Sequence, residues 1–219
     1  MKLLLVCGPG GSGTTAVAGV LDNLGAIGFG PYLHTNDERT RNCYELIPFR
    51  DIVRRCISEE TMSPRSGMDI KSELQNFRQR IMNQELGPYD ISAGVPIFLK
   101  EPFSAVIIPQ ISEIFDTRLI YVLRPFAEIE ATRVRRAWGF TFSGARVIYS
   151  HMFFDLVNYR IPTLIVRFPD LIACPVEQVM QIAEFSGLKA NPTTILAASN
   201  FIATHRLTYG QGNGRTAVA

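Results

Sequence analysis

Short apolar runs alternate along the chain with segments that have helical spacing. Residues 2–7 (KLLLVC) are continuously apolar and lead directly into glycines, which is typical of a strand buried on both faces. Residues 14–24 then repeat apolar side chains at helical intervals, and Gly25 follows as a stop signal. Later apolar runs of strand length lie at residues 96–99, 119–123 and 163–166.

Helix-like sequence follows each of the three later runs, and the helices are expected at residues 104–115, 126–137 and 175–186. Two more helices are expected at 44–57 and 68–86, whereas residues 28–43 are rich in turn formers and predict a loop. Strands that alternate with helices favour a parallel sheet covered on both faces. The predicted fold class is therefore α/β, with three layers and a central parallel β-sheet flanked by helices.

Length and composition suit one domain over residues 1–219, since 219 residues with 47% hydrophobic side chains can bury a full core. Within it we expect a helical and loop insertion at about 30–95 and a flexible tail at 208–219. The net charge of +2 gives no argument for nucleic acid or an anionic membrane. The four cysteines are scattered without a C-x-x-C pair, and no apolar stretch reaches membrane-spanning length. These features predict a cytoplasmic protein with neither a metal site nor a disulfide framework.

The glycine-rich stretch at residues 8–15, GPGGSGTT, nearly completes the phosphate-binding pattern G-x-x-x-x-G-K-[ST]. It lies between a predicted strand and a predicted helix, as that motif requires. Backbone N–H groups of residues 11–15 are expected to point into one concavity at the positive end of the helix dipole. The alternative, a tight turn that only packs strand against helix, is less favoured by the position, the spacing and the two threonines.

Thr14 stands where the motif has lysine, and this departure is informative. Enzymes that transfer a γ-phosphoryl group need that lysine, Mg²⁺ and an aspartate that places the metal. No candidate strand here is an apolar run that ends directly in aspartate. A terminal sulfuryl group carries one negative charge and requires less cationic stabilisation, so the loop favours a sulfate-bearing nucleotide.

A second anion site is suggested by the segment RLIYVLRPFAEIEATRVRR. Arg124 ends a predicted strand, where ligands gather in open α/β sheets. Thr132 follows two helical turns later on nearly the same face. An arginine and a hydroxyl placed together would hold a compact phosphate. Taken alone, however, the two residues favour the alternative in which Arg124 caps or salt-bridges locally and Thr132 is a surface helix residue.

Taken together, GSGTT and IYVLRPFAEIEAT resemble the two nucleotide-binding motifs of the sulfotransferase family, whose members use 3′-phosphoadenosine 5′-phosphosulfate (PAPS). The resemblance implies a P-loop-type fold. It also implies that the first motif binds the 5′-phosphosulfate and that Arg124 and Thr132 bind the 3′-phosphate. The residues that match the first motif are Ser12, Gly13, Thr14 and Thr15, with Gly11 beside them.

Further stretches are similar to the family in the same order along the chain: HTNDERTRNCYE, FLKEP and the late segment TLIVRFPDL. Departures are also present. Gly11 stands where many members carry lysine or arginine, and Pro102 stands where some members have a catalytic histidine. Thr132 replaces serine and keeps the hydroxyl.

Three side chains are candidates for the chemistry. Lys100 ends a predicted strand near the first motif and is expected to stabilise charge on the leaving phosphate. Glu101 is the first choice for the general base, because some branches of the family use glutamate and burial would raise its pKa. His34, in a polar loop, is the second choice, and Glu45 is expected to position that loop on resemblance alone.

The resulting prediction is a transferase that moves a sulfuryl group from PAPS to a hydroxyl or amine by direct in-line transfer, leaving 3′,5′-adenosine bisphosphate (PAP), without a metal. The expected partner is a small-molecule or carbohydrate acceptor, and neither nucleic acid nor membrane. Two alternatives stay open: a P-loop kinase of nucleosides or small molecules, and a family member that binds a nucleotide without turnover. The acceptor and the oligomeric state are not encoded in any motif.

Overall fold

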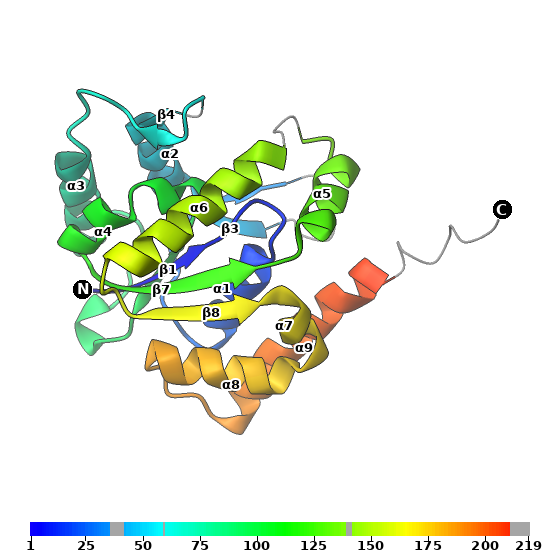
Figure 1. The fold of residues 1–219 in the computed structure, drawn as a ribbon. Coiled ribbons are helices and arrows are strands. Elements are labelled where there is room, and N and C mark those ends of the chain that lie inside the picture. The colour runs from blue at the N-terminus through cyan, green and yellow to red at the C-terminus, as the bar shows by residue number, and fades with distance from the viewer. Residues whose placement is uncertain (36–41, 59, 139–141, 211–219) are drawn as a thin grey trace.

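The computed structural model describes residues 1–35, 42–58, 60–138 and 142–210, and its centre is a parallel sheet (Figure 1). Four strands form this sheet: β1 (Lys2–Cys7), β6 (Ile97–Lys100), β7 (Asp116–Leu123) and β8 (Thr163–Arg167). Their order is β6-β1-β7-β8, and every neighbouring pair is parallel. The prediction of a central parallel sheet flanked by helices is confirmed.

Helices cover both faces of the sheet, because each buried strand has apolar side chains on both sides. They are α1 (Thr14–Asn23), α2 (Ile47–Cys56), α3 (Ile70–Met82), α4 (Ile108–Ile114), α5 (Phe126–Arg135), α6 (Phe142–Asn158), α7 (Phe168–Ala173), α8 (Pro175–Ser186) and α9 (Pro192–Gly210). Two short 3₁₀ segments, η2 (Ile91–Ala93) and η3 (Pro102–Val106), complete the helical elements described.

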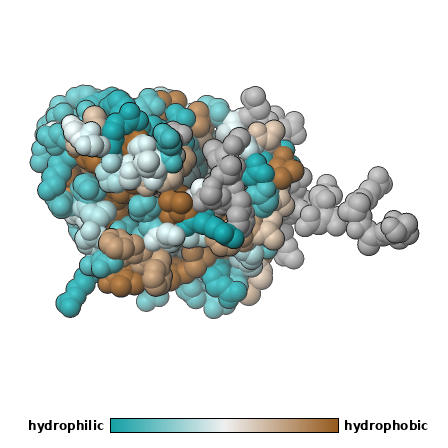
Figure 2. Space-filling model, turned by 45° about the horizontal axis from the view of Figure 1, so that its top comes forward, coloured by the Kyte–Doolittle hydropathy of each residue, from teal (hydrophilic) through white to brown (hydrophobic). Residues whose placement is uncertain are grey.

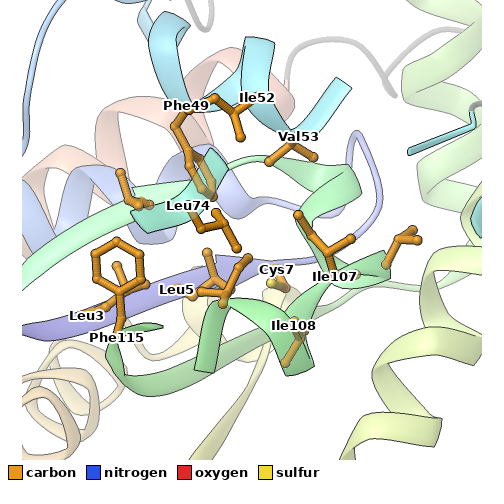
Figure 3. Packing of buried hydrophobic residues seen from close by; sticks show 14 of the residues in the cluster. Leu3, Leu5, Cys7, Phe49, Ile52, Val53, Leu74, Ile107, Ile108 and Phe115 are labelled. Carbon is orange, nitrogen blue, oxygen red and sulfur yellow. The ribbon is translucent and has the colours of Figure 1, made fainter. Parts of the chain in front are cut away.

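Alternate residues of β1 divide the core into two halves. Leu3, Leu5 and Cys7 face a cluster contributed by α2, α3, α4 and α6, and Figure 3 shows how these side chains interdigitate. Leu4 and Val6 face the opposite cluster, formed by α1, α7, α8 and α9. The first strand is therefore buried on both faces, as its continuous apolar run predicts.

The segment between α1 and β6 forms a separate edge of the molecule. It contains the antiparallel pair β2 (Tyr32–His34) and β3 (Asn42–Leu46), then α2, the short pair β4 (Ile57–Ser58) and β5 (Ser63–Pro64), and α3. In Figure 1, α2 and β4 lie at the upper left, and α3 lies at the left beside α4. This is the region in which the acceptor-side insertion was expected.

Several element boundaries differ from expectation for reasons of backbone chemistry. The loop predicted at 28–43 contains β2 and the start of β3, because strands this short leave little pattern in the sequence. The helix predicted at 44–57 begins only at Ile47, with Pro48 in its first turn. The helix predicted at 104–115 is divided into η3 and α4, and Pro109 sits in the first turn of the new helix. Most of the predicted flexible tail lies outside the described residues.

Some large apolar side chains remain on the surface. Phe153, Phe154 and Val157, on the outer side of α6, are 69%, 56% and 66% exposed. Figure 2 shows apolar side chains interspersed with polar ones, with one apolar group along the lower edge of the face in view. None of the helices in the described part of the chain is long and apolar enough to cross a membrane.

Candidate functional site

The loop between β1 and α1 has the backbone conformation of an anion-binding turn. Gly11 and Gly13 adopt φ values of 87° and 104°, which L-residues with side chains rarely adopt, and Gly13 is the N-cap of α1. Among the described residues, the backbone N–H groups of Gly13, Thr14 and Thr15 donate to no protein acceptor. These donors lie at the positive end of the helix dipole and suit a phosphate or sulfate oxygen.

The residues of this loop that carry hydroxyl groups are buried or half-buried. Ser12 is fully buried, and its Oγ has no hydrogen-bond partner in the described part of the chain. Thr14 and Thr15 line the adjoining cavity together with Gly11 and Gly13. A buried hydroxyl without a hydrogen-bond partner is unusual in a native fold. An anion bound in this loop would supply an acceptor for it.

Arg124 follows the end of β7 and reaches across to the first loop. Its Nη1 donates to the Gly11 carbonyl oxygen at 2.8 Å and to Thr132 Oγ1 at 3.3 Å. Its guanidinium carbon lies 4.7 Å from the centre of the Phe168 ring, and the arginine side chain is only 8% exposed. The predicted proximity of Arg124 and Thr132 is confirmed, and the Gly11 contact joins the two motifs into one site.

A carboxylate also contacts this arginine. Glu128, four residues later on α5, accepts a hydrogen bond from Arg124 Nε at 2.8 Å and is 46% exposed. The local salt bridge that the sequence left open is therefore present. Because Glu128 is half-exposed, an incoming phosphate can displace it into solvent and take over the same donor.

A cavity of about 720 Å³ opens beside the two motifs. The first loop and α5 line one part of it, and β2, β3, α2, η3 and the start of α6 contribute to the rest. Its cationic lining comes from Arg50, Arg54, Lys100, Arg133 and Arg136. Apolar side chains, among them Leu33, Met62, Phe103 and Ile148, line it as well. This size and mixture of side chains suit a nucleotide together with part of a second small molecule.

Lys100 ends β6 next to the P-loop strand, since its register partner on β1 is Val6. Its Nζ donates to Glu45 Oε1 at 2.7 Å and to the Cys43 carbonyl oxygen at 3.0 Å. The residue is 3% exposed but lines the cavity. A buried, paired ammonium at this position is suited to stabilise negative charge that develops beside the P-loop.

Glu101 faces the protein interior. It is fully buried and caps η3 by accepting the Phe103 N–H at 2.6 Å. Arg54 Nε donates to its other carboxylate oxygen at 3.3 Å. Burial, assisted by the charge of Glu45, raises the pKa of Glu101 to about 7, although Arg54 opposes this shift.

The cavity lining includes Glu45 and excludes both residues predicted as bases. Glu101 does not line the cavity, and His34 is exposed on β2 between Leu33 and Thr35, which do line it. Both assignments therefore stay predictions. Glu45 is 13% exposed and lies between Lys100 and Arg50, whose Nε is 3.8 Å from Glu45 Oε2.

Sequence reasoning missed two of the cationic side chains that line the cavity, Arg50 and Arg54. They lie one helical turn apart on α2, and this i, i+4 spacing was the available signal. Trp138 lines the cavity under the Arg136 guanidinium, with 4.7 Å between the guanidinium carbon and the ring centre. Within the described residues, no group of three or more His, Cys, Asp or Glu side chains has the arrangement of a metal site.

A parallel sheet with a glycine-rich loop after its first strand, and an arginine after the neighbouring strand, defines an α/β protein of the P-loop type. Comparison with protein-family models and with curated protein sequences gives no match. Solved structures do match over most of the chain.

Sulfotransferase STF1 from Mycobacterium tuberculosis H37Rv superposes with a TM-score of 0.59 at 16% identity, covering 95% of this chain and 73% of that one. The sulfotransferase domain of the Synechococcus PCC 7002 olefin synthase gives 0.51 at 17% identity, with 89% and 76% covered. A sugar kinase from Janibacter sp. HTCC2649 gives 0.47 at 13% identity, with 86% and 96% covered, too low a score to support an argument. The resemblance found in the motifs is thus confirmed at the level of the fold, which this chain shares with sulfotransferases.

Proposed function

We propose that this protein is a sulfotransferase that moves a sulfuryl group from PAPS to a hydroxyl or amine acceptor by direct in-line transfer. The observation that carries the proposal is the hydrogen bond between Arg124 and the Gly11 carbonyl. It brings the second anion-binding motif against the first, so that one nucleotide with phosphate groups on both sides of its ribose can contact both.

The residues present fit this donor. The N–H groups at the start of α1 would hold its 5′-phosphosulfate, and Arg124 with Thr132 would hold its 3′-phosphate. Trp138, already stacked with Arg136 in the cavity, offers an aromatic face for the adenine. The donor supplies an activated sulfuryl group, and its diphosphorylated nucleoside leaves.

Transfer requires an acceptor oxygen or nitrogen to form a bond to sulfur while the bond between sulfur and the bridging phosphate oxygen breaks. Lys100 Nζ lies beside the P-loop and would stabilise the negative charge that develops on the leaving phosphate. A carboxylate would accept the proton from the acceptor. Among the carboxylates, the geometry favours Glu45, since it lines the cavity and contacts Lys100.

The acceptor is proposed to enter between α2 and α6, where Arg50 and Arg54 of α2 and apolar side chains of α6 line the cavity. This region accommodates a small molecule or a sugar unit. We propose no role for nucleic acid, membrane or metal in the reaction.

Calorimetric titration with PAP, 5′-AMP and Mg²⁺-ATP tests the donor. We expect PAP to bind without metal and more tightly than 5′-AMP. Arg124→Ala is expected to weaken PAP roughly 10- to 100-fold, the loss typical of charge-assisted hydrogen bonds. The matched control is Arg160→Ala, an exposed arginine beyond α6. Binding of Mg²⁺-ATP without binding of PAP would replace this proposal with the kinase, and PAP binding without transfer to any acceptor would favour a non-catalytic protein.

A further inference from the structure

Tyr149 contacts the main chain of Arg124 at two points. Its hydroxyl accepts a hydrogen bond from the Arg124 N–H at 2.9 Å and donates one to the Arg124 carbonyl oxygen at 3.1 Å. A single side chain thus satisfies both backbone groups of the residue that follows β7. Backbone groups just beyond a strand have no hydrogen-bond partner in the sheet. The tyrosine hydroxyl supplies that partner and so fixes the position of the Arg124 backbone.

The tyrosine belongs to a different element from the arginine. It lies on α6, and its ring packs edge-on against Phe126, the first residue of α5, with ring centres 5.3 Å apart. Neighbouring residues of α6, Gly144, Ala145, Val147 and Ile148, line the cavity. One side chain therefore joins the cavity wall formed by α6 to the second anion-binding motif.

The position of Arg124 matters because its guanidinium meets several partners in a confined space. It donates to Gly11 and to Thr132 while lying over the Phe168 ring. Displacing its backbone by a few tenths of an ångström would misalign these contacts.

We infer that Tyr149 is a positioning residue for the 3′-phosphate site, which it fixes through the backbone of Arg124 while tying that site to the α6 wall of the cavity. This inference rests on the proposed function, because it assumes that Arg124 receives the 3′-phosphate. It assigns Tyr149 no contact with the reacting atoms.

A positioning role predicts a selective loss. Tyr149→Phe keeps the ring and its packing against Phe126 but removes both hydrogen bonds to Arg124. The affinity for PAP is expected to fall about ten-fold, on the scale of one to two lost hydrogen bonds. The affinity for 5′-AMP, which lacks the 3′-phosphate, is expected to stay unchanged.

The matched control is Tyr159→Phe, just past the end of α6, where the ring is 39% exposed. It should leave both affinities at wild-type values. Combining Tyr149→Phe with Arg124→Ala closes a double-mutant cycle. In the Arg124→Ala background the tyrosine substitution should have no further effect on PAP binding.

Three results would overturn the inference. They are an unchanged affinity of Tyr149→Phe for PAP, an equal loss of affinity for PAP and 5′-AMP, and an effect that is independent of Arg124 in the cycle. A wild-type protein that binds no PAP would instead refute the proposed function and remove the inference with it, and this outcome is visible before any variant is made.

Hydrogen exchange on the wild-type protein keeps the test open if Tyr149→Phe does not fold. Addition of PAP should increase protection both around Arg124 and in the first turns of α6, whereas 5′-AMP should protect neither. Protection of the Arg124 segment alone would contradict a connection through Tyr149.

Discussion

Replacing Asp155 by asparagine is expected to stabilise the fold at neutral and alkaline pH. Asp155 lies on α6 facing the sheet and is 4% exposed, and its Oδ2 has no hydrogen-bond partner in the described part of the protein. The titratable groups near it on the strands are Cys7 and Tyr121, and burial raises the pKa of both. In the described part of the chain, no cationic side chain forms an ion pair with the Asp155 carboxylate.

The magnitude follows from the pKa. Burial raises the pKa of Asp155 from 3.8 to about 7. A shift of roughly three units corresponds to at most about 4 kcal/mol between the two protonation states. Asparagine has nearly the same shape and never ionises, so at pH 8 the variant should gain stability on the order of 2–4 kcal/mol.

The sign depends on pH in a definite way. Below pH 4 the carboxyl is protonated in both the folded and the unfolded state and contributes nothing. Between about pH 4 and 7 the unfolded state ionises first, so wild-type stability falls as pH rises, and above pH 7 the full penalty remains.

Urea denaturation of wild type and Asp155→Asn at pH 5 and pH 8 measures this difference. Glu101 titrates in the same range, so the quantity to compare is the difference in unfolding free energy between the two proteins at each pH. Asp116→Asn, at an exposed position where β7 begins, is the control and should change little. A variant less stable than wild type at pH 8, or a difference independent of pH, would refute the reasoning by revealing a stabilising partner for the carboxylate.

Further substitutions test the loop and the site. Gly13→Ala would place a Cβ 2.1 Å from the Phe168 ring at a φ of +104°, and we expect it to lower the free energy of unfolding in urea by on the order of 3 kcal/mol. The control, Gly25→Ala, has open space around it and should lower that free energy by about 1 kcal/mol. Equal losses would contradict close packing of the P-loop. Glu45→Gln is expected to lower kcat about 10²- to 10⁴-fold while PAP affinity stays constant, and an active variant would return the base assignment to another carboxylate. Glu128→Gln removes the carboxylate that competes for Arg124 and should strengthen PAP binding about three-fold; calorimetry showing weaker binding would mean that this carboxylate orients the arginine.

The sequence predicts the parts of the fold that depend on local pattern. The apolar run of β1, its glycine-rich loop and the strand–helix alternation are enough to predict a parallel sheet. Arg124 and Thr132 lie two turns apart, so helical geometry predicts their proximity, which the 3.3 Å contact confirms.

Contacts between distant segments were beyond that reasoning. Glu45 reaches Lys100 across 55 residues only because β3 packs beside β6. Helix α6 went unpredicted because its outer side carries Phe153, Phe154 and Val157 where an amphipathic helix would be polar. The orientation of Glu101 toward the interior likewise follows from capping η3, which no spacing in the sequence reveals.

Gly11 is the point at which the two anion-binding motifs come into contact with each other. A Cβ at this position would lie 3.2 Å from the Thr132 methyl group, at a φ of +87°. Because Gly11 has no side chain, Thr132 of the second motif can pack directly against it. Arg124 donates a hydrogen bond to the carbonyl oxygen of the same glycine. A side chain at position 11 would therefore require Thr132 to move by a few tenths of an ångström and would strain the backbone at this φ. A cation introduced into this loop at position 11 would thus disturb the second motif as well as the first.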